Sequence, residues 1–168
     1  MFRIAILLLA AAIFATAQEV EVRRHDQEGV RLAQSGELPA AIEQFRAALH
    51  LDPSYVDAWY HLGLAYGQAR NTDEAMAAFE EALRIHSDYL EARYMLADCC
   101  RKRGDFTGEL SLLADVVKRA PGFAEAHYNY GLALKNQEKV QQAVKELRAA
   151  ARLSPSNPKY LLALGIAL

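Results

Sequence analysis

Two short stretches decide the fold of this chain: residues 59–66, with the sequence WYHLGLAY, and residues 75–82, with the sequence AMAAFEEA. In both, apolar residues recur every three or four positions, which is the spacing of one helix face. Gly63 and Ala75 are small enough to let two helices approach closely. Phe79 and Tyr66 are expected to fill the space between this pair of helices and the next. The two stretches therefore predict an antiparallel helix pair.

The pattern recurs along the chain at a spacing of 34 residues. Full copies span 22–55, 56–89, 90–123 and 124–157, and a partial fifth copy spans 158–168. The copies differ in detail: His25 stands where the second copy has Trp59, and Glu109 stands where it has Ala75. No single pair can bury its own apolar face, so neighbouring pairs must stack. The sequence thus predicts an all-helical solenoid.

Turn-forming residues lie where the helices should end. Gly36 and Gly104 occupy positions where a helix end favours a left-handed residue. Thr72 and Asp105 are expected to cap the helices that follow. Prolines, as at Pro53, close the pairs because proline cannot continue a helix.

The second copy resembles the tetratricopeptide repeat signature. The matching residues are Trp59, Leu62, Gly63, Tyr66, Ala75, Phe79 and Ala82, while Ser87 replaces the usual final proline. The resemblance covers nearly all of residues 18–168. It implies a right-handed superhelix of antiparallel helix pairs, in which the first helix of each pair lines a concave groove that binds peptides or proteins.

The resemblance also implies which side chains face the groove. Tyr60, Tyr94 and Tyr128 fall on the same repeat position and would form a tyrosine ladder suited to peptide recognition. Tyrosine at that position also serves packing, which is the alternative. The full candidate set is Tyr60, Tyr94, Tyr128, Asp57, Gln68, Asp98, Arg101, Lys102, Lys135 and Asn136.

The charged members of this set have two interpretations. Acids such as Asp57 gather near the starts of the first helices, and bases such as Arg101 and Lys135 gather near their ends. Acidic and basic rims could orient an extended partner chain. The helix dipole favours the same arrangement without any partner.

Composition argues against several classes of function. Just over half of the 168 residues are hydrophobic, and the formal net charge is −2, so a nucleic-acid partner is not expected. The five histidines are scattered, and no phosphate-binding loop or nucleophile motif occurs. We expect no enzyme activity, no metal and no cofactor. Cys99 and Cys100 are adjacent and are expected to be buried free thiols.

The first 17 residues differ from the rest of the chain. One arginine, a short apolar stretch and small residues at the end are typical of a secretory signal peptide. An uncleaved N-terminal anchor is the alternative. We therefore expect an exported protein, periplasmic or secreted, with residues 1–17 as signal and residues 18–168 as the repeat domain. After signal removal no membrane span is expected.

The C-terminal stretch, residues 160–168, is apolar. It is either part of a longer repeat array or a cap that leaves apolar surface for a partner. The leading hypothesis for function is a non-enzymatic scaffold that binds a peptide or protein segment in its groove. The alternative is a self-associating module that forms a homo-oligomer through Leu161–Leu168. A small ligand or glycan held by the tyrosines is a third option.

Overall fold

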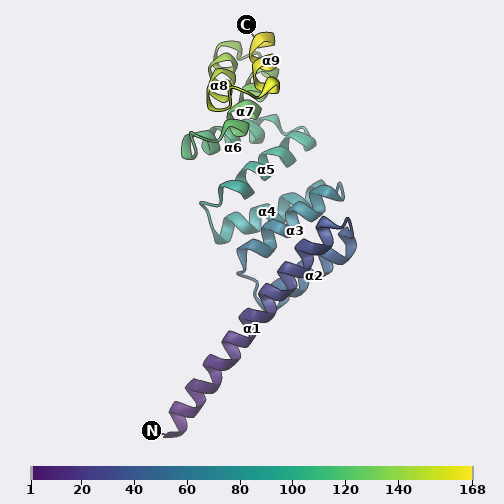
Figure 1. Cartoon of the computed structure of the whole chain (residues 1–168), viewed down its shortest axis with the longest axis vertical. Coiled ribbons are helices and arrows are strands. Elements are labelled where there is room, and N and C mark those ends of the chain that lie inside the picture. Colours follow the sequence, from purple (N-terminus) through teal and green to yellow (C-terminus); the bar gives the residue numbers. More distant parts are fainter. Residues whose placement is uncertain (1, 168) are drawn as a thin grey trace. The chain divides into compact units, whose positions relative to one another are not determined.

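The computed structural model describes the backbone of residues 2–167 and the side chains of residues 14–167. Across these residues the chain forms helices joined by short turns and contains no strand (Figure 1). The helices are α1 (Phe2–Gln34), α2 (Leu38–Leu51), α3 (Val56–Gln68), α4 (Thr72–Ile85), α5 (Leu90–Arg103), α6 (Phe106–Arg119), α7 (Ala124–Asn136), α8 (Val140–Leu153) and α9 (Pro158–Ala167). The all-helical fold class is therefore confirmed.

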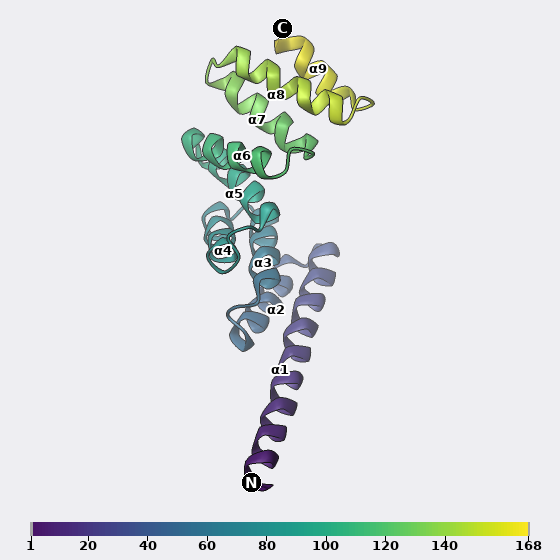
Figure 2. The same cartoon turned by 90° about the vertical axis from the view of Figure 1, so that its left-hand side faces the viewer.

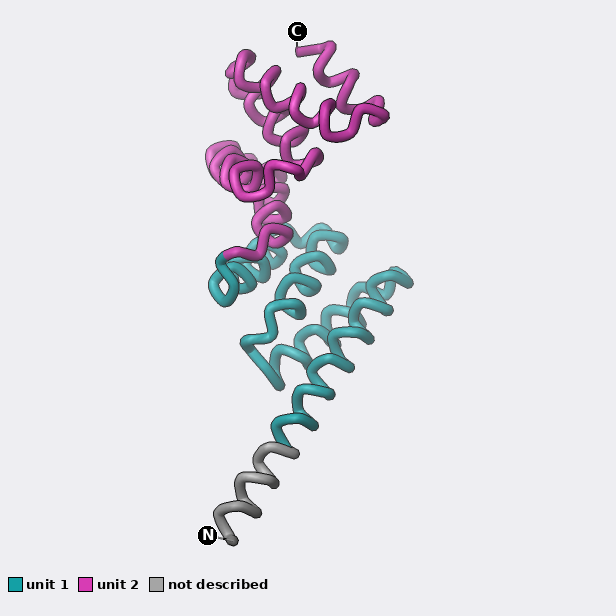
Figure 3. Tube along the Cα trace, turned by 60° about the vertical axis from the view of Figure 1, so that its left-hand side comes forward, with its two compact units in different colours: residues 1–87 teal, residues 88–168 magenta. Residues whose placement is uncertain are grey.

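The chain divides into two compact units, residues 1–87 and residues 88–168 (Figure 3). In the first unit α1 packs on α2 and α3 packs on α4, and α2 joins the two pairs through α3. In the second unit α5 packs on α6 and α7 on α8, and α9 lies against α8, as Figure 2 shows. The helix pairs recur at the 34-residue spacing, except that α1 begins at Phe2, well before residue 22.

A glycine at the crossing point sets the close approach of three of the four pairs. A Cβ atom built on Gly63 would lie 2.6 Å from the Phe79 ring, which is closer than real carbon atoms approach. The equivalent contacts in the first and fourth pairs join Gly29 to Phe45 and Gly131 to Leu147. The third pair instead packs Ala97 against Leu113.

Phe79 fills the space inside its own pair, where Gly63 leaves room for its ring. Its packing between pairs stays a prediction, although Phe45 at the equivalent position contacts His61 of the next pair, with ring centroids 5.7 Å apart. Tyr66 does act between pairs, because its hydroxyl accepts a hydrogen bond of 2.8 Å from Arg46 of α2.

The turn inside each pair contains a left-handed residue at the same repeat position. Gly36 and Gly104 have φ of 84° and 80°, as predicted. Arg70 and Glu138 adopt the same conformation, with φ of 63° and 58°, although neither is glycine. The repeat geometry thus imposes this conformation whatever the residue, at a cost of roughly 1 kcal/mol for a side chain with a Cβ.

The predicted caps are half correct. Asp105 caps α6, since its carboxylate accepts a hydrogen bond of 2.9 Å from the Gly108 amide. Thr72 is not a cap, because α4 already begins at Thr72 and Asn71 occupies the cap position without a side-chain bond. The repeat position of Asp105 is that of Asn71, one residue earlier than Thr72.

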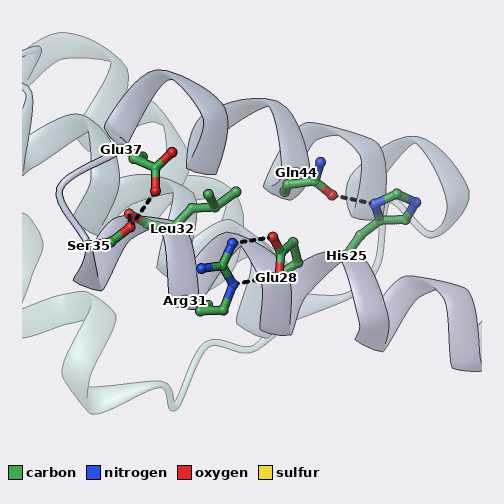
Figure 4. Close-up of polar contacts among 7 residues, drawn as sticks. All are labelled: His25, Glu28, Arg31, Leu32, Ser35, Glu37 and Gln44. Carbon is green, nitrogen blue, oxygen red and sulfur yellow. Dashed lines mark hydrogen bonds and ion pairs between the residues drawn. The ribbon is translucent and has the colours of Figure 1, made fainter.

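At the repeat position of Trp59, the other three pairs have a polar contact between their two helices, including Arg93 of α5 with Asp115 of α6 at 3.1 Å. His25 Nδ1 of α1 lies 2.7 Å from Gln44 Oε1 of α2 (Figure 4). His127 of α7 stands at the same repeat position and lies 2.7 Å from Glu146 of α8. In both pairs the histidine ties the first helix to the second.

α9 buries one face and exposes the other. Tyr160 and Ala167 are buried against the preceding pair. Leu161, Leu162 and Ile166 are exposed by 50%, 66% and 62%. None of the helices over the described residues is long and apolar enough to cross a membrane. The expected signal peptide falls largely on residues whose side chains lie outside the described part, so it stays a prediction.

Candidate functional site

The second unit contains a cavity of about 320 Å³ between α5, α6 and α7, which we call the α5–α7 cavity. Residues on successive turns of α5 and α7 form its walls, and Lys159 at the start of α9 lies at its edge. Five of the ten predicted groove residues line it: Tyr94, Asp98, Arg101, Tyr128 and Asn136. Half of the candidate set therefore lines one cavity, and its role in binding stays a prediction.

Tyr94 is the half-buried tyrosine of this cavity. Its ring packs against Phe123, with centroids 4.9 Å apart, and its hydroxyl accepts a hydrogen bond from the Asn129 amide. Burial, together with the nearby Glu125 carboxylate, raises the pKa of Tyr94 well above its usual value. The hydroxyl therefore stays protonated at any physiological pH and remains a neutral hydrogen-bonding group.

Tyr128 is used mainly for packing. Its side chain is buried, and its ring lies against Tyr160 of α9, with centroids 5.0 Å apart. The Lys159 ammonium lies 4.5 Å from the centroid of the same ring, which is a cation–π contact. These contacts correspond to the packing alternative for the tyrosine ladder.

Tyr60 belongs to the first unit, where its ring contacts Phe79 and His61. The first copy has Asp26 at the same repeat position. Asp26 is buried, and its carboxylate lies 2.8 Å from His61 Nδ1. A ladder that joins the tyrosines of both units into one binding surface stays a prediction.

The charged groups of the α5–α7 cavity are mostly paired. Asp98 forms ion pairs with Arg101 and with Lys102, the latter at 2.8 Å. Burial opposes the charge on Asp98, but the hydrogen bonds from Lys102 and Arg101 outweigh it and lower its pKa. Asp98 is therefore an ionised, already satisfied carboxylate.

Glu109 of α6 is the residue that sequence reasoning missed as part of the site. Its side chain is only 4% exposed and lines the cavity, yet its carboxylate makes no hydrogen bond or ion pair with the residues that the structure describes. Burial raises the pKa of Glu109, and the nearby Arg101 only partly offsets this. The signal in the sequence is the departure from alanine at this repeat position.

The other predicted groove residues lie elsewhere. Gln68 lines a cavity of about 240 Å³ in the first unit, beside Phe45 and His61. Asp57 lies exposed in the first turn of α3, and Lys135 lies in the last turn of α7. Across residues 14–167 no group of three or more His, Cys, Asp and Glu side chains is arranged to hold a metal ion.

The repeats match known family profiles. Residues 29–69 match the family described as TPR repeat, and residues 63–122, 110–158 and 131–168 match the family described as Tetratricopeptide repeat.

Several curated proteins share part of this sequence. The Peroxisomal targeting signal receptor of Komagataella phaffii is 32% identical over 132 residues, which is 76% of this chain and 23% of that protein. The human PEX5-related protein is 32% identical over 97 residues, which is 58% of this chain and 16% of that protein. This chain thus spans less than a quarter of the length of these relatives.

Solved structures share the fold. MamA residues 41 to the end, from Desulfovibrio magneticus RS-1, superpose with a TM-score of 0.81 at 22% identity, covering 88% of this chain and 83% of that one. YrrB, described as a TPR protein with an unusual peptide-binding site, superposes with a TM-score of 0.78 at 24% identity, covering 94% of this chain and 80% of that one. At this identity the likeness speaks for the fold alone. The family profiles cover most of the chain, which belongs to the tetratricopeptide repeat family.

Proposed function

We propose that this chain is a non-enzymatic scaffold that binds a segment of another protein, and that the α5–α7 cavity anchors that segment. The observation that carries the proposal is the cavity itself, which combines an aromatic wall with several polar groups in one hollow. A peptide receptor among its relatives and a peptide-binding protein among its structural neighbours support the same class of function.

The chemistry of the cavity suits an extended backbone. Asn129 and Asn136 are seven residues apart on α7, so they lie on the same helix face, and both line the cavity. A side-chain amide offers both a donor and an acceptor, as a peptide backbone does. Tyr94 adds a flat apolar surface whose hydroxyl stays neutral. No cofactor, metal or nucleic acid is part of this proposal.

Selection from a displayed library of random peptides tests the proposal. The immobilised full chain should enrich peptides that a Tyr94→Ala, Asn136→Ala variant binds at least about tenfold more weakly. Asn71→Ala is the matched control, because Asn71 is exposed in the first unit and forms no side-chain cap bond. Equal binding by the cavity variant and the wild type would place the peptide site elsewhere.

We also propose that the protein is exported to the periplasm or secreted, with residues 1–17 removed. The composition of those residues supports this. Mass spectrometry of the N-terminal peptide from an exported fraction should find a chain that begins at Gln18. A chain that retains Met1 would instead support an uncleaved anchor.

Self-association is a second candidate, supported by one observation. α9 exposes Leu161, Leu162 and Ile166 on one side while its other side is buried. Such an apolar strip can be covered by a second copy of the chain.

A further inference from the structure

Glu109 stands where the chain otherwise places alanine. The equivalent residues of the other three pairs are Ala41, Ala75 and Ala143, and all three are fully buried where the two helices of the pair meet. A glutamate at this position must extend its carboxylate beyond the crossing, and here it lines the α5–α7 cavity. The residue is only 4% exposed, so its carboxylate has lost most of its contact with water and keeps contact only through the cavity.

Of the charged groups that line the cavity, the cations have partners in the described part of the chain and the Glu109 carboxylate does not. Arg101 is bonded to Asp98, and Lys159 lies over the Tyr128 ring. Each cation that lines the cavity thus has a partner, whereas the Glu109 carboxylate has none among the described residues. The cavity lacks one hydrogen-bond donor, and a positively charged donor would compensate the buried carboxylate best.

We propose that Glu109 makes the α5–α7 cavity selective for a bound segment that carries a lysine or arginine side chain. The cationic head binds the Glu109 carboxylate, and the aliphatic stem packs against Tyr94 and Leu132. This inference rests on the proposed peptide-binding function and names the side chain that the cavity recognises. A volume of about 320 Å³ has room for one long side chain of the bound segment.

Protonation should control this recognition. Burial raises the pKa of Glu109, Asp98 raises it further, and Arg101 lowers it. Tyr94 also lines the cavity, and its raised pKa keeps it neutral, while Lys159 is the other cation in the lining. Since only the ionised carboxylate attracts a cation, affinity for a lysine-bearing segment should rise as pH increases through the raised pKa of Glu109.

The experiment compares peptide selections on the wild-type chain, on Glu109→Gln and on Glu80→Gln. Glu80 is an exposed acid of α4 and serves as the matched control. The wild type and Glu80→Gln should enrich peptides with one lysine or arginine at a constant position, and Glu109→Gln should lose that enrichment. Replacing the selected lysine by methionine should weaken binding to the wild type by about tenfold and leave binding to Glu109→Gln unchanged.

The outcomes separate the two proposals. A selection that enriches no peptide at all contradicts the peptide-binding function itself. Three other results overturn the role of Glu109 but leave the binding function standing. The first is that the wild type enriches peptides that lack a basic residue, and the second is that it enriches peptides with an acidic residue instead. The third is that Glu109→Gln enriches the same basic residue as the wild type. Circular dichroism and urea unfolding show whether Glu109→Gln is folded. Affinity measured across pH should rise for the wild type and for Glu80→Gln, but not for Glu109→Gln.

Discussion

Gly63 lets α3 and α4 approach closely because its side chain is only a hydrogen atom. Its position leaves room for the Phe79 ring, which is only 1% exposed and cannot move away. The third pair solves the same problem differently, with Ala97 against the smaller Leu113. The two residues at each crossing therefore depend on each other.

Gly63→Ala should lower the free energy of unfolding by about 1–3 kcal/mol, because the added methyl group overlaps the Phe79 ring. Adding Phe79→Leu should restore part of that loss, as the third pair suggests. Gly67→Ala is the matched control. Gly67 lies in α3 with open space around it, so the change should raise the free energy of unfolding by roughly 0.5–1 kcal/mol. Urea unfolding measures all three, and equal effects at Gly63 and Gly67 would contradict this account.

Glu138→Gly should stabilise the chain by about 0.5–1 kcal/mol, because Glu138 holds a left-handed conformation that glycine adopts without strain. Gln137→Gly, one residue earlier and at φ −99°, should instead lower stability. The midpoint of chemical unfolding gives the sign of each change. If both variants have a lower unfolding midpoint than the wild type, the left-handed conformation of Glu138 carries no strain.

The structural roles of residues could be predicted where a small side chain or a left-handed backbone is required, as for Gly63 and Gly36. The role of Glu109 could not be predicted, because a sequence shows which residue departs from the pattern but not whether its side chain meets a partner or a cavity. Tyr94 and Tyr128 share a repeat position but have different partners, since Tyr94 contacts Phe123 and Asn129 whereas Tyr128 packs against Tyr160 of α9.

At the scale of helices, hydrogen-bonded polar pairs connect one helix to another. Asp26 of α1 is only 6% exposed and lies 2.8 Å from His61 of α3, so this pair links the first two repeats. This pair could not be predicted from the sequence, since the two residues are 35 positions apart and belong to different copies. The 34-residue spacing predicted the helices themselves, because each copy contains its own turn and close crossing.

His61→Leu should destabilise the chain by about 1–3 kcal/mol, since it leaves the buried Asp26 carboxylate without its partner. Adding Asp26→Leu should recover most of the loss, because a pair of apolar groups leaves no polar atom unsatisfied. Hydrogen exchange of the α1 amides locates the effect. If the double variant is less stable than His61→Leu, the bond does more than satisfy two buried groups.

At the scale of the whole molecule, α9 of the second unit is covered on one side only. α9 begins a fifth copy, and Gly165 corresponds to Gly63, yet nothing lies within 4 Å of a Cβ built there. Leu162→Lys should therefore abolish any concentration-dependent rise in mass measured by light scattering, whereas Leu153→Lys, at an exposed leucine of α8, should not. A wild-type chain that stays monomeric at every concentration would contradict self-association through α9.

Cys99 and Cys100 are buried in α5, as the sequence predicted. Burial raises the pKa of the Cys99 thiol to about 11, so little reactive thiolate exists near neutral pH while the helix is packed. An alkylating reagent can then modify these thiols only when the third repeat opens. The chain thus carries its own reporter of local unfolding, and labelling rates followed with and without a bound peptide would measure how much a ligand slows the opening of that repeat.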